Sequence, residues 1–289
     1  MRFTKLHGLG NSYFFVNCFY ETVTNPEGLA KDLSGKQFFD KNFGAGSDGL
    51  ILVMPPSDQT KADIRMRIFN ADGSEAEMCG NGVRCAAKFA YDRGLSFNNP
   101  MRVETGRGVL TLDLHVKGFK VEGVTVNMGE PILKLPEIPV NADRLEPGKK
   151  DGGWVIPGLP EVVEANFVSM GNPHAVIFVP DVEAVDVKKL GPLIEKHPAF
   201  PNRINVHWAQ TLSTGEVRMA TWERGSGMTL ACGTGACAVC VASALGGLTD
   251  RSTKAHLPGG TLLLDWKKQN NCVFMTGPAT EVCDVELRA

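Results

Sequence analysis

The chain has 289 residues, of which 43% are hydrophobic and 21% are charged, and its formal net charge is -2. The length predicts two domains, and the composition is that of an ordinary soluble globular protein. A net charge so close to zero argues against a basic nucleic-acid-binding surface, so we expect no nucleic-acid partner.

The N-terminal segment MRFTKLHGLGNSYFFVN does not have the pattern of a secretory signal, because His7, Gly8 and Gly10 interrupt its apolar residues. No apolar run in the chain approaches the ~18 residues that indicate a membrane span. We therefore expect a cytoplasmic protein without a membrane partner. Since the chain is long and shows no export signal, its eight cysteines are expected to be reduced thiols.

Most of the chain predicts short strands, which are apolar or alternating segments bounded by Gly, Pro, Asn or Asp. Only a few segments look helical, and the two clearest are each followed by a glycine, a common helix stop. A region rich in Pro, Gly and charge, residues 136–160, predicts a long surface connection or a hairpin. The strands are predicted at residues 48–54, 63–69, 108–116, 120–128, 166–170, 174–179, 216–222 and 261–266, and the helices at residues 80–93 and 233–245.

An internal repeat relates the two halves of the chain. Residues 66–82 and 219–235 each begin with a methionine, reach a cysteine 13 residues later and end in Cys-Gly-x-Gly. A shorter repeat places Leu-Gly-Asn at residues 9–11 and Met-Gly-Asn at residues 170–172. The equal spacing argues against chance and predicts two similar domains that face each other across a cleft.

Each repeated cysteine, Cys79 and Cys232, is predicted at the point where a loop turns into a helix. The first N–H groups of a helix lack internal partners and carry positive potential. They can therefore hold a carboxylate, and they make a nearby thiol more acidic than a free one, whose pKa is about 8.5. If two such thiols flank one α-carbon, one removes its proton and the other returns a proton to the opposite face, which inverts the stereocentre.

Other interpretations of the cysteines have less support from the sequence. Cys237-x-x-Cys240 has the spacing of a redox motif but lies inside the second predicted helix, which favours buried packing. A zinc site would need a second suitably spaced pair of ligands. A Cys–His nucleophile with His174 or His207 as partner would leave the repeat unexplained.

Residues 70–84, Asn-Ala-Asp-Gly-Ser followed by Cys-Gly-Asn-Gly-Val-Arg, resemble the signature of the diaminopimelate epimerase family. Residues 221–238 resemble the second cysteine motif of that family. The resemblance covers nearly the whole chain. Further segments that match in order are residues 3–11, 44–49, 170–174 and 203–206.

The resemblance implies an α/β (α+β) fold of two pseudo-symmetric domains. Each would be a barrel-like, mostly antiparallel sheet wrapped around a central helix, with the active site in the cleft between them. The first domain would span residues 1–123 joined by residues 278–289, and the second residues 124–277. The family implies no pyridoxal phosphate, no metal and no other cofactor, and it is compatible with a homodimer.

The implied activity is the interconversion of LL- and meso-diaminopimelate, in lysine biosynthesis. By resemblance, Cys79 and Cys232 are the acid and base, Glu223 binds the α-amino group, and His174 orients Glu223 or tunes a thiol. The residues that would hold the α-carboxylate at the helix starts are Gly80, Asn81, Gly233 and Thr234. The residues that would bind the distal amino-carboxylate end are Asn11, Asn70, Asn172, Asn205 and Arg224, an amide and guanidinium set that suits those charges.

Four alternative functions remain at this point. A proline racemase-like enzyme would share the fold and the two thiols, but its substrate gives the asparagines and Arg224 no purpose. A phenazine-biosynthesis isomerase-like protein would be expected to lack the cysteine pair. The others are a redox sensor that forms a disulfide between Cys79 and Cys232, and a non-catalytic carboxylate-binding module. Some family members carry a glutamine in place of Gly49, and a glutamate or a small residue is common in place of Met228, so neither residue is assigned a role.

Overall fold

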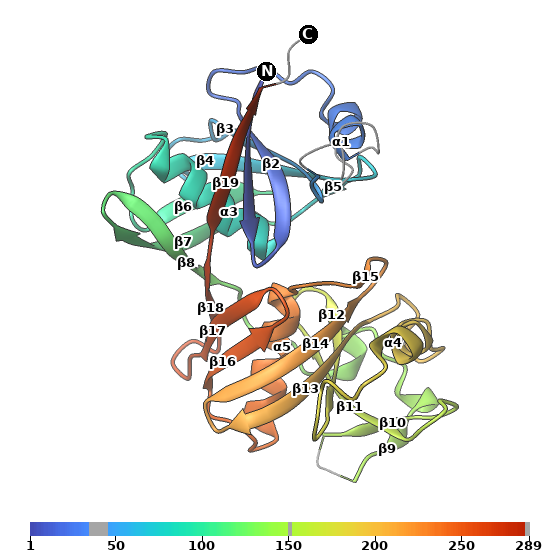
Figure 1. Ribbon diagram of the computed structural model, residues 1–289. Coiled ribbons are helices and arrows are strands. Elements are labelled where there is room, and N and C mark those ends of the chain that lie inside the picture. Colours follow the sequence, from blue (N-terminus) through green and yellow to red (C-terminus); the bar gives the residue numbers. More distant parts are fainter. Residues whose placement is uncertain (35–45, 150–151, 287–289) are drawn as a thin grey trace. The chain divides into compact units, whose positions relative to one another are not determined.

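The computed structural model describes residues 1–34, 46–149 and 152–286. The chain divides into two compact units, of which unit 1 comprises Met1–Asn127 and Thr276–Ala289 and unit 2 comprises Met128–Met275 (Figure 1). The sequence placed these boundaries at 123/124 and 277/278. Gly44 and Ala45 of the predicted motif 44–49 lie outside the described residues.

Unit 1 is a sheet of mixed direction in which most neighbouring strands are antiparallel. Its N-terminal strand β1 pairs with β2 and with the C-terminal strand β19, antiparallel to both. Strand β2 then pairs with β3 in parallel, β3 with β4 antiparallel, and β4 with β6 in parallel. The elements are β1 (Arg2–Gly8), β2 (Asn11–Asn17), α1 (Pro26–Ser34), β3 (Gly49–Met54), β4 (Ile64–Asn70), β5 (Glu75–Ala76), α3 (Gly80–Asp92), β6 (Met101–Thr105), β7 (Gly108–Lys117), β8 (Lys120–Asn127) and β19 (Thr280–Glu286).

Unit 2 repeats this order of pairing. Strand β11 pairs with β12 antiparallel, β12 with β13 in parallel, β13 with β14 antiparallel, and β14 with β16 in parallel. Strand β18 then leads the chain back into unit 1. The elements are η1 (Leu135–Glu137), η2 (Ala142–Arg144), β9 (Glu146–Pro147), β10 (Trp154–Ile156), β11 (Val163–Ser169), β12 (Pro173–Phe178), α4 (Val187–Glu195), β13 (Asn205–Ser213), β14 (Glu216–Glu223), β15 (Gly227–Met228), α5 (Gly233–Leu245), β16 (Ser252–Leu257), β17 (Gly260–Trp266) and β18 (Val273–Pro278).

The matching order confirms the repeat that the sequence predicted. In each unit, two strands and a helix lead to a parallel pair, then to a hairpin, a second helix and further antiparallel strands. Both units are mostly antiparallel sheet with few helices, as the family resemblance implied. The eight strand segments and two helices predicted from the sequence are all present, with ends that differ by a few residues.

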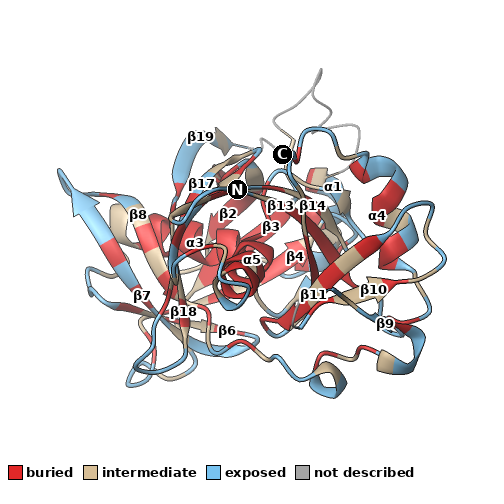
Figure 2. Ribbon diagram, turned by 90° about the horizontal axis from the view of Figure 1, so that it is seen from below, coloured by how far each residue is buried: buried red, intermediate tan, exposed pale blue. Residues whose placement is uncertain are grey.

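One helix lies at the centre of each unit. Helix α3 packs against β1, β2, β3, β4, β6, β7 and β8, and α5 packs against β11, β12, β13, β16 and β17. Residues 80–90 of α3 and 235–243 of α5 are buried, and Figure 2 shows both helices mostly in the colour of buried residues. A helix surrounded by sheet must be apolar on all sides, and the Ala, Cys and Val residues of α5 satisfy this requirement with small side chains.

In the described part of the region 136–160, β9 and β10 pair antiparallel, in agreement with the hairpin that was one of the two predicted alternatives. The segment is not merely a surface connection. Ile138, Val140, Leu145 and Ile156 are buried in the hydrophobic core of unit 2 with Trp208. Its Pro and Gly content concealed these isolated apolar residues, since they follow neither a helical nor a strand period.

Candidate active site

The cysteines of the two repeats occupy equivalent positions at the starts of the central helices. Cys79 is the N-cap residue of α3 and Cys232 is the N-cap residue of α5, both with extended backbone, φ -137° and φ -122°. The predicted position of each thiol at a helix start is therefore confirmed. Cys79 is half-buried, whereas Cys232 is only 3% exposed.

In unit 1, Cys79 receives hydrogen bonds from two sides. Its Sγ lies 3.4 Å from the backbone N–H of Gly82 and 3.8 Å from the hydroxyl of Tyr13, and it can itself donate to Asn11 Oδ1 at 3.6 Å. Burial raises the pKa of Tyr13 well above its ordinary value, and the Cys79 charge raises it further. Tyr13 therefore keeps its proton and can donate it in a hydrogen bond to a Cys79 thiolate.

The amides around Cys79 are held by charged groups. Asn11 Nδ2 donates to Asp48 Oδ2 at 3.0 Å, and Asn81 Nδ2 donates to Asn11 Oδ1 at 3.4 Å. Arg84, which is fully buried, donates to Asn81 Oδ1 at 2.8 Å and to the Gly80 carbonyl at 3.0 Å. The first turn of α3 is thus fixed by an arginine of its second turn, so the thiol and the two neighbouring N–H groups keep a defined direction.

Asn70 lies at the end of β4 in a tight turn, where its Nδ2 donates to Ser74 Oγ at 3.0 Å. The opposite residue of β3 is Gly49, which has a φ of +154°. A Cβ at this position would overlap the carbonyl oxygen of Phe69. A side chain at this position would require the neighbouring backbone to shift, which is a physical reason for the glycine that the sequence left unassigned.

In unit 2, Cys232 is more deeply buried than Cys79, and it lies near a carboxylate. Burial raises the pKa of Cys232 well above its ordinary value, and the Glu223 carboxylate raises it further. The Thr234 hydroxyl, 3.7 Å from Sγ, and the Gly235 N–H act in the opposite direction. Burial also raises the pKa of Glu223, whose Oε1 accepts from Thr229 Oγ1 at 2.6 Å. Cys232 is therefore a protonated thiol near neutral pH.

A chain of polar side chains leads away from Thr234 into the core of unit 2. Asn172 Nδ2 donates to Thr234 Oγ1 at 3.4 Å, and Asn172 Oδ1 lies 2.9 Å from His174 Nε2. His174 Nδ1 lies 2.8 Å from His207 Nε2, and His207 Nδ1 lies 3.0 Å from Thr221 Oγ1. The hydrogen bonds of His174 thus run to Asn172 and His207, and in the described residues none runs to Glu223.

The two histidines are expected to make the protein sensitive to acid. Burial lowers the pKa of His207 from 6.5 to about 3, and burial together with the nearby His207 and Arg224 lowers the pKa of His174 well below 6.5. At a pH between the lowered pKa of each histidine in the folded chain and its ordinary pKa of 6.5 in the unfolded chain, the unfolded chain binds a proton that the folded chain does not. The free energy of unfolding therefore falls as pH falls, by about 1.4 kcal/mol per pH unit for each histidine.

Urea denaturation at about pH 7 and about pH 5 measures this loss. A His207→Gln variant should lose less stability than the wild type between the two conditions, whereas a variant of the exposed His115 should behave like the wild type. Equal losses in the wild type and in His207→Gln would contradict the assignment of a neutral, buried His207.

Asn205 and Arg224 lie together where β13 begins and β14 ends. Asn205 Oδ1 accepts from the Arg224 backbone N–H at 3.0 Å, and its Nδ2 donates to the Pro173 carbonyl at 2.9 Å. The Arg224 guanidinium donates through Nη1 to the Asn202 carbonyl at 3.0 Å. Asn205 is therefore a bridge that fixes the arginine backbone.

A buried carboxylate that the sequence did not identify anchors the same loop. Glu195, at the end of α4, accepts from Trp222 Nε1 at 2.7 Å and from the Gly225 backbone N–H at 3.0 Å. Arg203 lies 3.2 Å from the same carboxylate. Glu195 therefore fixes the residues on both sides of Glu223 and Arg224.

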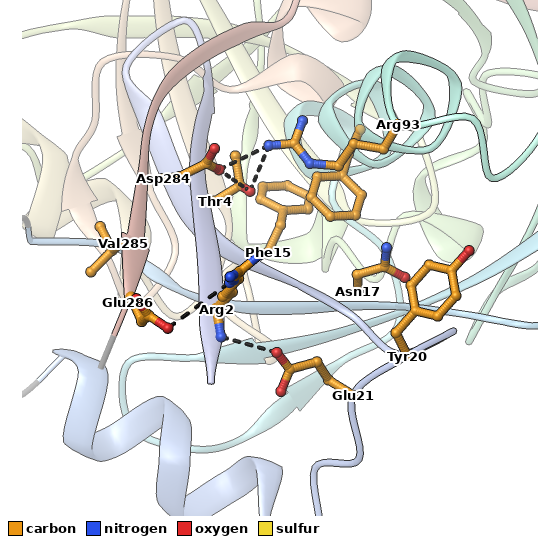
Figure 3. A pocket seen from close by; sticks show the side chains of 11 residues that line it. Arg2, Thr4, Phe15, Asn17, Tyr20, Glu21, Arg93, Asp284, Val285 and Glu286 are labelled. Carbon is orange, nitrogen blue, oxygen red and sulfur yellow. Dashed lines mark hydrogen bonds and ion pairs between the residues drawn. The ribbon is translucent and has the colours of Figure 1, made fainter. Parts of the chain in front are cut away.

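The pocket drawn in Figure 3 is not part of this site. It has a volume of about 700 Å³ and lies in unit 1, lined by charged and aromatic residues that include Arg2, Phe89, Arg93 and Asp284. Phe89 and Arg93 belong to the C-terminal end of α3, whereas Cys79 precedes its first residue. A helix rises 1.5 Å per residue, so the length of α3 separates the pocket from the thiol by roughly 15–20 Å.

All eight cysteines lie in the described ranges and are free thiols. Within residues 1–34, 46–149 and 152–286, no group of three or more His, Cys, Asp or Glu side chains is placed to hold a metal ion. No helix of those ranges is both long and apolar enough to cross a membrane.

The chain resembles known proteins in both sequence and fold. It is 50% identical to the diaminopimelate epimerase of Acetivibrio thermocellus over 291 residues, which cover 99% of this chain and 98% of that protein. It is 44% identical to the diaminopimelate epimerase of Methanococcus maripaludis over 294 residues, which cover 99% of both chains.

Solved structures share the fold at much lower identity. A probable proline racemase from Agrobacterium radiobacter has a TM-score of 0.67 at 14% identity, with 99% of this chain and 92% of that chain covered. A phenazine biosynthesis protein of the PhzF family from Bacillus anthracis has a TM-score of 0.64 at 15% identity, with 100% and 99% covered. The sequence model described as diaminopimelate epimerase matches residues 3–134 and 166–282, so the chain belongs to the diaminopimelate epimerase family.

Proposed function

We propose that this protein interconverts LL- and meso-diaminopimelate in lysine biosynthesis, with Cys79 and Cys232 as its acid and base and with no cofactor. The observation that carries the proposal is the matched position of the two thiols, each the N-cap residue of the central helix of a duplicated unit. Reversible inversion needs two groups of similar chemistry, because each acts as base in one direction and as acid in the other.

In the proposed reaction, Cys79 and Cys232 act on opposite faces of the α-carbon of one substrate molecule. The Cys79 thiolate takes the α-proton, so that the C–H bond breaks and an S–H bond forms. The carbanion then takes the proton of the Cys232 thiol on the opposite face. The product leaves Cys79 protonated and Cys232 as thiolate, and the reverse reaction starts from that state.

The surroundings of the thiols support the assignment of Cys79 as the base and Cys232 as the acid in this direction of the reaction. Tyr13 and the Gly82 N–H can both donate to a Cys79 thiolate. Burial and the Glu223 charge instead favour a protonated Cys232. Substrate binding changes this balance, because the α-ammonium would neutralise Glu223 while the N–H groups of Gly80, Asn81, Gly233 and Thr234 hold the α-carboxylate.

The polar side chains further from the thiols would bind the distal end of the substrate. In the described part of the chain, one donor of the Arg224 guanidinium is used, by Asn202, and the others can form the fork that a carboxylate requires. Asn11, Asn70 and Asn172 offer amide groups for the distal ammonium and carboxylate. Asn205 is a fourth such amide, and its bonds to the Pro173 carbonyl and to the Arg224 N–H also hold Arg224 in place.

A solvent-exchange measurement tests the reaction type. In heavy water, turnover of LL-diaminopimelate should place solvent deuterium on the inverted α-carbon, because the returning proton comes from a thiol that exchanges with solvent. Mass spectrometry of substrate and product follows the label. A short panel with proline as a second substrate tests specificity, and label in proline but not in diaminopimelate would assign the chain to a racemase of another substrate.

We also propose a cytoplasmic homodimer with a small-molecule substrate and no nucleic-acid partner. The formal net charge of -2 argues against a nucleic-acid partner, and the family resemblance suggests the homodimer and the cytoplasmic location. Light scattering after size-exclusion chromatography measures the mass, for which a monomer would give 31.2 kDa.

A further inference from the structure

The polar chain behind Thr234 crosses three neighbouring strands of unit 2. Thr221 lies on β14, His207 on β13 and His174 on β12, and the last two are fully buried. Thr221 is the register partner of His207 in the antiparallel pair. A row of buried polar groups costs stability unless every member is bonded, so its presence requires an explanation.

The hydrogen-bonding capacities fix the direction of the chain. An amide oxygen only accepts, so His174 Nε2 must carry a proton and donate to Asn172 Oδ1. The neutral ring then accepts at Nδ1, which requires a proton on His207 Nε2. His207 in turn accepts at Nδ1 from the Thr221 hydroxyl. Both rings are therefore Nε2–H tautomers.

The consequence appears at the thiol. With its oxygen facing His174, the Asn172 amide presents its Nδ2 to Thr234 Oγ1. Because Thr234 Oγ1 accepts that bond, its own proton is left to donate to Cys232 Sγ, 3.7 Å away. If both rings held their protons on Nδ1, the amide would turn over and the Thr234 proton would be drawn to Asn172 instead of to sulfur.

Neutral rings are required for this direction to hold, and burial supplies that condition. It lowers the pKa of His207 to about 3 and the pKa of His174 well below its ordinary value. A doubly protonated ring would have no acceptor nitrogen, and the chain of bonds would be interrupted.

Unit 1 shows that the fold does not need such a chain. The positions of its sheet that match His207 and Thr221 are occupied by Ile51 and Ile68, which are register partners of each other. The residue that matches His174 is Tyr13, which donates directly to Cys79. The unit 1 amide has the opposite orientation too, because Asn11 accepts from Asn81 whereas Asn172 donates to Thr234.

Packing holds the His207 ring in place. A Cβ at Gly235, in the first turn of α5, would overlap this ring. The second glycine of Cys-Gly-x-Gly therefore lets the ring pass directly beneath the helix start. The ring is thus held between the first turn of α5 and Thr221.

We infer that His207 and Thr221 are positioning residues for Cys232, which through His174 and Asn172 aim the Thr234 hydroxyl proton at its sulfur. The inference rests on the proposed function for its catalytic meaning. It assigns these two residues a purpose that no substrate contact requires. It also makes the two thiols differ. Cys79 accepts directly from the Tyr13 hydroxyl, whereas Cys232 accepts from Thr234, whose direction is set by the distant Thr221 hydroxyl.

The tautomers can be read without any assay of activity. In the full chain labelled with ¹⁵N-histidine, long-range ¹H–¹⁵N correlation spectra distinguish Nδ1–H from Nε2–H rings. Two of the six histidines, His174 and His207, should be fixed Nε2–H tautomers that stay neutral near neutral pH. An Nδ1–H tautomer at either buried ring would overturn the inference, whether or not the protein is an epimerase.

A matched pair of variants tests the effect on the thiol. Thr221→Val keeps the shape but removes the hydroxyl, so His207 should lose its single tautomer and kcat/KM should fall about ten-fold, the scale of one hydrogen bond to a charged group. Thr221→Ser restores the hydroxyl and should recover both the spectrum and the rate. Wild-type kinetics in Thr221→Val, or equal loss in both variants, would overturn the inference. Absence of epimerisation in the wild type would instead refute the proposed function.

Discussion

Replacing either Cys79 or Cys232 by alanine is expected to abolish interconversion of LL- and meso-diaminopimelate. Each thiol is the sole acid or base on its face of the α-carbon in the proposed reaction, and general acid–base catalysis contributes about 10²–10⁴-fold per group. We expect kcat to fall by about 10³-fold or more in each single variant, in both directions of the reaction. Turnover measured with each epimer as the starting substrate tests this.

The two central helices supply matched controls. Cys85 lies in α3 and Cys237 in α5, both fully buried in the same helices as the proposed catalytic thiols. Burial raises the pKa of Cys85 to about 12, so it cannot act as a base near neutral pH. Cys85→Ala and Cys237→Ala should therefore keep wild-type turnover. Normal turnover in Cys79→Ala or Cys232→Ala would refute the two-thiol mechanism.

Replacing Arg224 by alanine is expected to destroy substrate recognition while leaving the thiols intact. Its guanidinium is the proposed partner of the distal carboxylate, and loss of one partner of a charged hydrogen-bonded pair costs about 2–5 kcal/mol. We expect KM to rise by about 100-fold with a much smaller change in kcat, because the contact is made equally in the bound and reacting states. Steady-state kinetics with LL-diaminopimelate measures both constants.

Two further arginine variants sharpen this test. Arg224→Lys keeps the charge but not the fork, so its KM should stay well above that of the wild type. Arg218, on the same strand β14, pairs with the exposed Glu183, and Arg218→Ala should have wild-type constants. An unchanged KM in Arg224→Ala would show that the distal carboxylate binds elsewhere.

The sequence predicted the parts of the fold that depend on local patterns. The repeated spacing from methionine to cysteine reflects a strand, a hairpin and a helix start of fixed length, β4 to α3 and β14 to α5. The Ala-rich run of residues 233–245 has the small apolar composition of a helix surrounded by sheet. Family motifs then suggested the site residues, of which the described contacts join Asn11 and Asn81 to the start of α3, and Asn172 and Thr234 to the start of α5.

Helix α4 was missed because Gly191 and Pro192 lie inside it and both are typical of breaks. The structure explains the glycine, since a Cβ at Gly191 would overlap the Trp222 side chain. The packing of α4 against Trp222 outweighs the low helix propensity of Gly191 and Pro192. The nine residues of α4 alone give no sign of this contact.

The supporting residues of the site were missed for a related reason. Tyr13, Glu195 and Thr221 contact the site through partners that are distant in the sequence, such as Thr221 beside His207 on the neighbouring strand. His207 was considered only as a partner of a nucleophilic cysteine. Its actual neighbours, His174 and Gly235, are brought to it by the parallel pairing of β12 with β13 and by the first turn of α5.

Unit 1 contains both β1 and β19, so its sheet is completed by the strand that follows all of unit 2. Residues 1–127 are synthesised first. Their N-terminal strand β1 cannot pair with its second neighbour, β19, until Thr280–Glu286 have been synthesised. Unit 2 is continuous in the sequence, so it can fold while the sheet of unit 1 still lacks β19. The sheet of unit 1 can therefore be complete only after the whole of unit 2 has been synthesised.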